Sequence, residues 1–445
     1  MHATEVFARY AAESCRQPLP AEVIHHAKRA VIDWHASLFP GLDAAPVRML
    51  EQTLADDLDR GGAFLAQGRP ATARAAALIN GTAAHAAEVD DSFREAMYHP
   101  GAATIAAALA EGQDIGASGL QFLRGVVLGY EVSTRIGVVM GRSHYKFWHS
   151  TGTVGSFGAA AAAGGLMALD EAAFAHALAT AATFTAGLQQ AFRMDSMSKP
   201  LHAGRAAEAG LLAAQLARRG LTGSLDVLDG EAGLGQAMSN GPDWSQVGAT
   251  LGQDFHITRL TFKNHIGCGH TFPSIDGALA LQSKHHIATE DIVHIRVGTY
   301  RPALDIACYE RPTSANEARF SLKYMVASAL VHGSVRMAAF EPARLEDPAT
   351  RALMERMEVA VDPALDAAFP GQRAARIEID TADGRRLSHL QPNRKGDPEE
   401  PLSDADLESK FLELSTPVIG AARARVLLER LWHLESATSC AITAC

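Results

Sequence analysis

The stretch His149–Leu169, HSTGTVGSFGAAAAAGGLMAL, contains no Asp, Glu, Lys or Arg and consists mainly of Ala and Gly. Its four hydroxyl residues, Ser150, Thr151, Thr153 and Ser156, make it too weakly hydrophobic for a membrane span. Because small side chains let helix backbones approach closely, the stretch predicts a tightly packed helix in the interior of a helical domain.

Neighbouring segments continue this pattern. Residues 71–88, 101–112 and 171–186 are also rich in Ala and Gly, so we expect them to pack around the first helix. Between them, apolar residues recur at helical spacing behind Ser118, a residue type that favours helix N-caps. These residues are Leu123, Val126, Val127 and Tyr130. The first 250 residues therefore predict one large helical domain.

The pattern changes after about residue 265. Val293, Ile295 and Val297 alternate with polar residues, which is typical of a half-buried strand. Asp383-Gly384 is a turn dipeptide between two further apolar segments. We expect a mainly α protein, with an all-helical domain formed by 1–265 and 402–445 and a smaller α+β lid domain over 266–401. The proline-containing segment 391–401 is predicted to be the linker between them.

Composition limits the function. The 445 residues suit two domains, and 47% of them are apolar, which excludes disorder as the main state. A net charge of −10 argues against a general nucleic-acid or anionic-membrane binder. Five scattered cysteines suggest no disulfide framework, and the charged N-terminus does not resemble a signal peptide. We expect a cytoplasmic soluble protein that binds neither nucleic acid nor membranes.

Several catalytic motifs are absent from the sequence. It contains neither of the glycine-rich nucleotide-binding patterns, no G-x-S-x-G and no H-E-x-x-H. This lowers the expectation of nucleotide chemistry, a serine-hydrolase elbow or a zincin site. A cofactor-independent enzyme without a metal, or a non-catalytic binding protein, remains open.

The densest polar cluster is His85, Glu88 and Asp91, followed by His99. The first three are spaced at i, i+3 and i+6, so a helix would place them on roughly one face. They could line a cleft, form a solvated helix end, or supply ligands for a metal. The last interpretation is disfavoured because no second cluster completes a ligand set.

A second cluster precedes the Ala- and Gly-rich helix. Here His144, Tyr145, Lys146 and His149 lie beside Phe147 and Trp148, which could anchor a loop. Because the helix N-terminus presents unpaired N–H groups, this region favours a carboxylate ligand.

Two lysines, a histidine and a cysteine are the remaining candidate site residues. Lys199 precedes a proline, and we expect it to project from a loop before a helix over 203–219, although a solvated lysine is the ordinary alternative. Lys263 and His265 lie near the expected domain junction, where ligand sites are frequent. Cys268 could be a nucleophile, but a packed thiol is more common.

Taken in order, these clusters resemble the MmgE/PrpD family. The matching strings are HAAEVDD (85–91), HPG (99–101), GYE (129–131), HSTGTVG (149–155), KPLHAG (199–204) and SLKY (321–324). The family includes 2-methylcitrate dehydratase, cis-aconitate decarboxylase and iminodisuccinate epimerase. The resemblance implies a helical domain with an α+β lid, a cleft between them, a homodimer and no required cofactor.

The resemblance also implies site residues, which bind a small di- or tricarboxylate. The cleft residues carried over are Glu88, Asp91, His99, His149, Lys199, Lys263 and Tyr324. His265 is added as a binding residue because it lies, like Lys263, near the expected domain junction, where ligand sites are frequent. We expect Lys199 to be one acid/base group and Tyr145 to be the other, with His149 as the alternative for the second role. Either group would need a lowered pKa to act as a base.

Two departures bear on the reaction. Glu88 stands where the decarboxylase members have Asp, and Cys268 stands where they have His. The loss of that imidazole puts cis-aconitate decarboxylation in doubt, and the compact chain favours the epimerase branch. The prediction is therefore an isomerase acting on a dicarboxylate such as iminodisuccinate, with a dehydratase- or decarboxylase-like lyase as the alternative.

Overall fold

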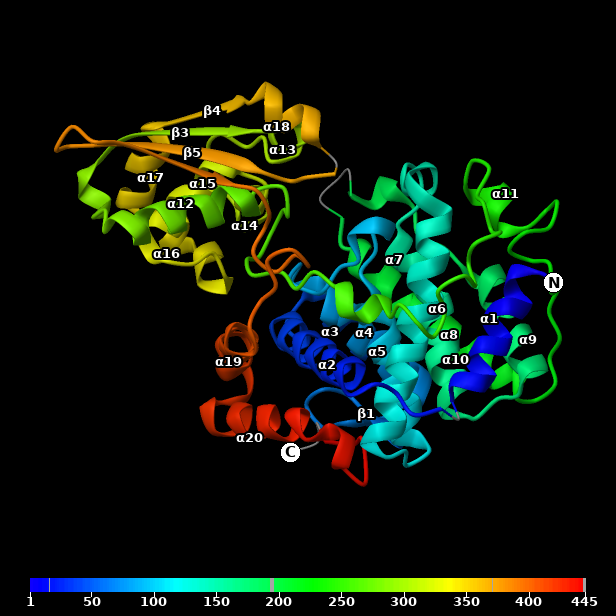
Figure 1. The fold of residues 1–445 in the computed structure, drawn as a ribbon. Coiled ribbons are helices and arrows are strands. Elements are labelled where there is room, and N and C mark those ends of the chain that lie inside the picture. The colour runs from blue at the N-terminus through cyan, green and yellow to red at the C-terminus, as the bar shows by residue number, and fades with distance from the viewer. Residues whose placement is uncertain (16, 193–195, 370, 443–445) are drawn as a thin grey trace. The chain divides into compact units, whose positions relative to one another are not determined.

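The computed structural model describes residues 1–445 except 16, 193–195, 370 and 443–445. The chain forms two compact units, one made of Met1–Phe262 with Ser403–Cys445 and the other of Lys263–Leu402 (Figure 1). The described regular elements of the first unit are helices apart from one small hairpin, and the second unit combines helices with a four-stranded sheet. The predicted fold class, mainly α with a smaller α+β part, is confirmed.

The helical unit contains α-helices of very different length, from four residues to 27 residues. Its α-helices are α1 Ala3–Ser14, α2 Ala21–Gly41, α3 Ala45–Thr53, α4 Ala73–Ala86, α5 Pro100–Asp114, α6 Gly119–Tyr145, α7 Ser150–Thr153, α8 Gly155–Leu166, α9 Glu171–Phe184, α10 Lys199–Ala217, α11 Leu234–Met238, α19 Asp404–Ile419 and α20 Ala421–Trp432. A small hairpin, β1 Leu58–Phe64 and β2 Pro70–Ala71, lies between α3 and α4.

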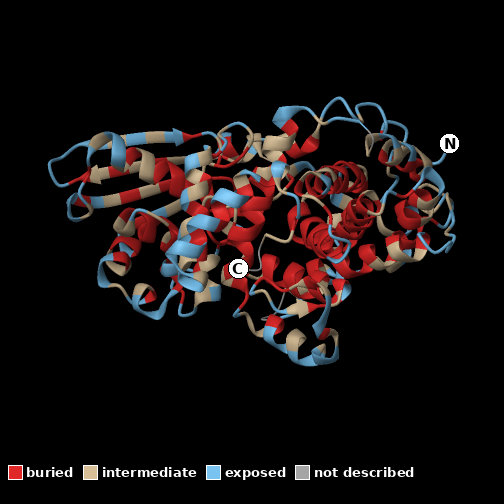
Figure 2. Cartoon of the chain, turned by 90° about the horizontal axis from the view of Figure 1, so that it is seen from below, coloured by how far each residue is buried: buried red, intermediate tan, exposed pale blue. Residues whose placement is uncertain are grey.

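Helix α8 is the centre of this unit, as its composition predicted. Eleven of its twelve residues are buried, and Figure 2 shows the buried helices gathered inside the unit. A Cβ on Gly158 would lie 2.4 Å from Thr104 of α5, and one on Gly210 of α10 would lie 2.3 Å from the carbonyl oxygen of Ser156. The small residues therefore bring three backbones into direct contact. Among the described residues, no helix is long and apolar enough to cross a membrane.

The C-terminal helices return to the helical unit. Lys410 of α19 is fully buried and donates hydrogen bonds to Asp33 of α2 at 2.6 Å and to the Val89 carbonyl at 2.8 Å. Because Val89 precedes two aspartates of the first polar cluster, this lysine connects the end of the chain to the segment that carries them.

The second unit is a four-stranded sheet with helices. Its elements are α12 Phe272–His285, β3 Ile292–Thr299, α13 Arg301–Ile306, α14 Ala315–Arg319, α15 Leu322–His332, α16 Pro342–Leu345, α17 Pro348–Glu355, β4 Met357–Val361, α18 Pro363–Ala368, β5 Ala375–Thr381 and β6 Arg386–Gln391. The strand order is β4-β3-β5-β6, with β3 parallel to β4 and antiparallel to β5. Helices α12, α15 and α17 lie on one side of this sheet (Figure 1).

The strand β3 follows its predicted pattern except at its start. Ile295 and Val297 are buried opposite Ile379 and Ile377 of β5. Val293 is 53% exposed, because the register shifts between Ile292 and His294 and turns Val293 away from the covered face. Its predicted burial was wrong.

The segment predicted as a linker, 391–401, is also structured. Arg394 donates two hydrogen bonds to Asp397, and both side chains are buried. Gln391 donates to Glu400 at 2.7 Å. The prolines end the strand, but this local ion pair holds the following turn inside the second unit.

Candidate active site

The first polar cluster does not lie on one helix face. Helix α4 ends at Ala86, and Glu88 adopts a left-handed backbone conformation with φ of 60°. This reversal turns the chain out of the helix, so Asp90 and Asp91 lie in a loop and not on the face of His85. The prediction of a shared helix face was wrong because the polar residues after Ala86 favour the turn.

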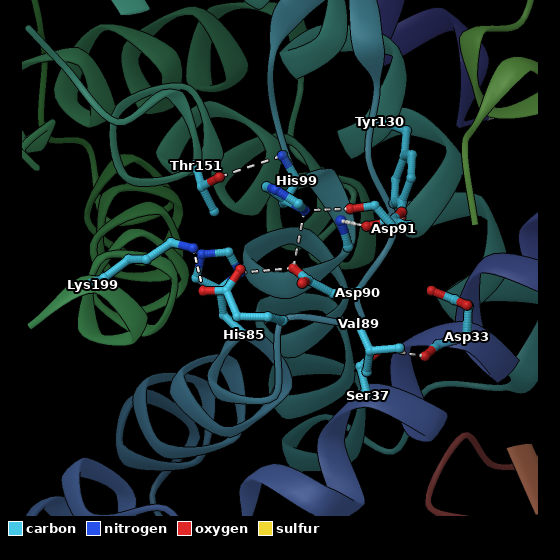
Figure 3. A network of polar contacts seen from close by, with 12 residues as sticks. Asp33, Ser37, His85, Val89, Asp90, Asp91, His99, Tyr130, Thr151 and Lys199 are labelled. Atoms are coloured by element: carbon cyan, nitrogen blue, oxygen red, sulfur yellow. Dashed lines mark hydrogen bonds and ion pairs between the residues drawn. The ribbon is translucent and has the colours of Figure 1, made fainter. Parts of the chain in front are cut away.

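The loop directs Asp90 back onto His85. Their Nδ1 and Oδ2 atoms are 2.7 Å apart, and both side chains are buried (Figure 3). The His99 ring lies against the same aspartate, with its Nδ1 3.4 Å from Oδ2 of Asp90 and 2.6 Å from the Asp91 carbonyl oxygen. Since a carbonyl oxygen only accepts, His99 carries a hydrogen on Nδ1. The interpretation as a solvated helix end is therefore wrong.

Asp91 points into the protein interior. Its carboxylate accepts hydrogen bonds from the Tyr130 hydroxyl at 2.7 Å and from the Gly101 N–H at 3.0 Å. Burial, followed by repulsion from Asp33, raises the pKa of Asp91 to about 8. Both carboxylate oxygens thus have protein partners, which fits a residue that positions His99 and the start of α5.

Lys199 is the first residue of α10, not part of a loop. Pro200 follows within the first turn of the helix, where its missing N–H removes no helical hydrogen bond. The Lys199 ammonium contacts the Glu88 carboxylate, and each side chain is about one-fifth exposed. Burial lowers the pKa of Lys199, but attraction to Glu88, Asp90 and Tyr145 outweighs it, so the net shift is upward. The expectation of a lowered pKa was wrong.

The pKa of His149 is shifted in the opposite direction, downward. His149 is 2% exposed and stacks on His85 with ring centroids 5.4 Å apart. Burial first, and then the neighbouring His85 and Lys199, hold the pKa of His149 well below the ordinary value. Although His149 is the N-cap residue of α7, its side chain makes no capping hydrogen bond. Its Nδ1 instead lies 3.0 Å from Nδ1 of His202 on α10.

The other members of the second cluster differ in position. Tyr145 ends α6 and lies close enough to Lys199 to influence its pKa. His144 is buried in a structural role, with Nε2 2.7 Å from Thr153 and Nδ1 3.0 Å from the Met238 carbonyl oxygen. Phe147 is 60% exposed and does not anchor the loop as expected.

Three side chains here have the ligand types of a metal site. One atom from each of His85, Asp90 and His99 lies within 4.8 Å of the others. In the present arrangement, however, the Nδ1 atoms of both histidines face oxygen acceptors. A metal at this point would have to displace those hydrogens, so the donor set fits a hydrogen-bonded dyad better than a cation site.

The remaining predicted residues belong to the second unit. Lys263 is buried at its start, and His265 is held by Asp276 at 2.8 Å. The Tyr324 hydroxyl donates to the Ala339 carbonyl oxygen and is fully buried. Cys268 is buried as well, which fits the packed-thiol interpretation.

The structure thus brings Glu88, His99, His149 and Lys199 into one cluster of the helical unit. It adds Asp90 and His202, to which the sequence analysis assigned no role. If the helix had been predicted to begin at Lys199, His202 would have been expected beside the lysine, since residues three apart share a helix face. Nothing in the sequence indicated that Asp90, and not Asp91, contacts His85.

Comparisons with known proteins identify the family of the chain. Residues 5–247 match the MmgE/PrpD N-terminal domain, and residues 265–434 match the MmgE/PrpD C-terminal domain. The chain belongs to the MmgE/PrpD family. Family members similar to it include the cis-aconitate decarboxylase-like protein oryM of Aspergillus oryzae, 29% identical over 94% of this chain and 91% of that protein. The cis-aconitate decarboxylases of Homo sapiens and Mus musculus are each 28% identical over 82% of this chain, covering 78% and 77% of those proteins.

Proposed function

We propose that this protein is an enzyme that transfers a proton at a carbon next to a carboxylate of a small di- or tricarboxylate. The observation that carries the proposal is the cluster of a protonated Lys199 with a neutral His149. Such a cluster holds a base and a cation close together, and that combination is what proton abstraction next to a carboxylate requires.

The chemistry follows from the charges. Loss of a proton beside a carboxylate builds enolate charge on a group that is already anionic, so the transition state needs a nearby cation. Lys199 supplies that charge and is held in position by Glu88. His149 is neutral near pH 7 and can accept the proton. His99, one-fifth exposed and oriented by Asp91, is available to bind a substrate oxygen.

Among reaction classes, we favour a lyase that eliminates water or carbon dioxide. The support is the similarity to proteins named as cis-aconitate decarboxylases, which extends over most of the chain. This choice reverses the order of the two sequence-based alternatives. Cys268, in place of the histidine of decarboxylase members, favours elimination of water within this class.

Epimerisation is the second candidate, and a specific observation supports it. An epimerase removes a proton with one group and delivers one with another. His149 in its basic form and Lys199 in its acidic form would provide such a pair. The homodimer and the cytoplasmic location expected from the sequence remain predictions.

The test is direct. The protein is incubated in D2O with cis-aconitate, 2-methylcitrate and the iminodisuccinate stereoisomers, and each is followed by NMR with and without EDTA. Release of water or carbon dioxide identifies a lyase, and interconversion of stereoisomers with deuterium uptake identifies an epimerase. We expect EDTA to leave the rate unchanged, because the Nδ1 atoms of His85 and His99 are engaged with oxygen acceptors. Saturable binding without turnover or exchange would contradict the proposal and favour a binding protein.

A further inference from the structure

His202 and His149 face each other through their Nδ1 atoms, which are 3.0 Å apart. A hydrogen bond between two ring nitrogens needs one N–H and one lone pair, so the pair shares a single proton at this contact. The two neutral rings must therefore be opposite tautomers. Whichever ring donates from Nδ1 has a lone pair on its own Nε2.

The surrounding backbone fixes this contact. A Cβ on Gly187 would lie 3.2 Å from the His202 ring, and one on Gly152 would lie 3.1 Å from the His202 Cβ. Gly187 also accepts a hydrogen bond from the His149 N–H at 2.9 Å. Two glycines thus let the chain close around both rings, and no larger side chain fits at either position without displacing His202.

The two rings differ in access to water. His149 is almost fully buried, whereas His202 is partly exposed. A positive charge is less costly on the more exposed ring, so a proton added to the pair is more stable on His202 than on His149. Burial first, and then His85 and Lys199, lowers the pKa of His202 to about 4. The pair is therefore neutral until catalysis supplies a proton and a compensating negative charge.

We propose that His202 is the proton acceptor behind His149. In the resting protein, His149 donates from Nδ1 to His202 and holds a lone pair on Nε2. When Nε2 takes a proton from the substrate carbon, the C–H electron pair stays on the substrate as enolate. The Nδ1 proton of His149 then moves to His202, which becomes imidazolium, and His149 is left neutral with its hydrogen on Nε2.

This relay leaves His149 with its hydrogen on Nε2 without moving the ring. Return of the His202 proton to Nδ1 of His149 would let Nε2 donate that hydrogen in a later step. The relay rests on the proposed function, because His202 acts through His149 and does not itself contact the substrate in this scheme. His202 lies three residues after Lys199 on α10, so one helix positions both the cation and the proton acceptor.

Two substitutions separate a relay from a purely structural contact. In His202→Asn, the amide oxygen can accept the His149 Nδ1 hydrogen and hold the ring, but it cannot take up a proton. In His202→Phe, ring volume is kept and the hydrogen bond is lost. A relay predicts that both variants lower kcat by roughly 10²-fold with little change in KM. If His202→Asn retains wild-type kcat while His202→Phe does not, His202 only positions His149 and the relay is wrong.

The assay uses whichever of cis-aconitate, 2-methylcitrate and iminodisuccinate the wild-type protein converts fastest. His286→Asn is the matched control, because His286 is exposed and its left-handed backbone suits Asn. Circular dichroism and thermal unfolding establish that each variant folds. If the wild type turns over a substrate and His202→Asn has the same kcat, the relay alone is wrong. If the wild type turns over none of the substrates, the proposed function is wrong.

A spectroscopic measurement tests the pair in the resting protein. With ¹⁵N-histidine labelling, two-bond ¹H–¹⁵N correlations identify the tautomer of each ring. We expect His149 to be the Nδ1–H tautomer and His202 the Nε2–H tautomer at pH 7. The His149 ring should show the same two-bond correlations in His202→Asn as in the wild type. The reverse assignment in the wild type would contradict the proposed resting state.

Discussion

At the scale of single residues, the same burial affects two neighbouring charges differently. His149 loses water, and the neighbouring His85 and Lys199 further disfavour a positive charge on its ring, so its neutral form is favoured. Lys199 loses water as well, but Glu88 stands directly against its ammonium and restores the charged form. The Glu88 carboxylate beside Lys199 is therefore the main difference between the two sites, and it favours a charged lysine next to a neutral histidine.

The first prediction concerns Lys199. Lys199→Ala should lower kcat by roughly 10²–10⁴-fold with little change in KM, because the ammonium acts mainly on the charge that develops in the transition state. Steady-state kinetics on the best substrate measure both constants. Lys146→Ala is the control, since Lys146 is exposed and lies over the Phe147 ring. A raised KM with kcat intact would instead show that Lys199 only binds a substrate carboxylate.

The second prediction concerns Glu88. Because its charge raises the pKa of Lys199, Glu88→Gln should lower that pKa. Activity that depends on the ammonium is lost as pH rises through this pKa, so the alkaline limb of the kcat profile should move to lower pH in the variant. Rates measured from pH 6 to 10.5 show the shift. An unmoved alkaline limb would mean that Glu88 does not control the protonation of Lys199.

At the scale of elements, the C-terminal helix α19 supports the loop that carries Asp90. Lys410 joins α2 through Asp33 and the loop through the Val89 carbonyl, with no exposed atoms on either charged side chain. Figure 3 shows Asp33 and Val89 beside the aspartates and histidines of the cluster. A helix more than three hundred residues away in sequence therefore helps to position the acidic loop.

The third prediction follows from this ion pair. Lys410→Met should destabilise the protein by about 3–5 kcal/mol, because it leaves the Asp33 charge buried without its partner. Asp33→Asn combined with Lys410→Met should recover part of that loss, and denaturant unfolding measures both. Arg9→Ala removes an ion pair to Glu171 that is about half exposed, so it should cost less than about 1 kcal/mol. Equal losses from the buried and exposed pairs would contradict this account.

At the scale of the whole molecule, buried groups with shifted pKa values control stability against pH. Burial lowers the pKa of His35 to about 4 and of His256 to about 3, in addition to His149 and His202. These histidines bind protons more readily when unfolded, so they favour unfolding as pH falls below about 6.5. Burial raises the pKa of Glu131 to about 7, as it does that of Asp91, and these carboxyls act in the opposite direction.

The fourth prediction is a stability maximum near pH 6.5. Burial also lowers the pKa values of His26, His144, His270 and His332 and raises those of Glu111 and Glu400. Below that pH, the histidines with lowered pKa values outnumber the carboxyls with raised ones, so stability should fall with acid. Above it, the histidines are neutral in both states. The folded protein still holds protons on Asp91 and Glu131 that the unfolded chain has lost, so stability should fall again towards pH 8. Thermal unfolding from pH 4.5 to 8.5 measures both slopes.

Asp91→Asn provides the control, since an amide cannot lose the proton that the carboxyl keeps when folded. The alkaline slope should become shallower in this variant while the acidic slope is unchanged. A stability that rises steadily from pH 6.5 to 8 in the wild type would show that these carboxyls are ionised in the folded protein.

Much of this protein was determined by its sequence at short range. The Ala- and Gly-rich composition of α8 predicted its central position, and Ser118 caps α6 through the Gln121 N–H as expected. Asp383-Gly384 forms the turn between β5 and β6. These features depend on residues within a few positions of one another, so local propensity and periodicity are sufficient to predict them.

Only the tertiary structure shows which way the pKa values of His149 and Lys199 are shifted. His149 meets His202 from 53 residues away, and Lys199 meets Glu88 from 111 residues away. Local propensity says nothing about such pairs, and a pKa depends on which charges lie nearby in space and how much water is excluded. The residue types of the site could therefore be predicted from the sequence. The roles of base and cation could not, because they depend on helices α4, α7 and α10 meeting at one point.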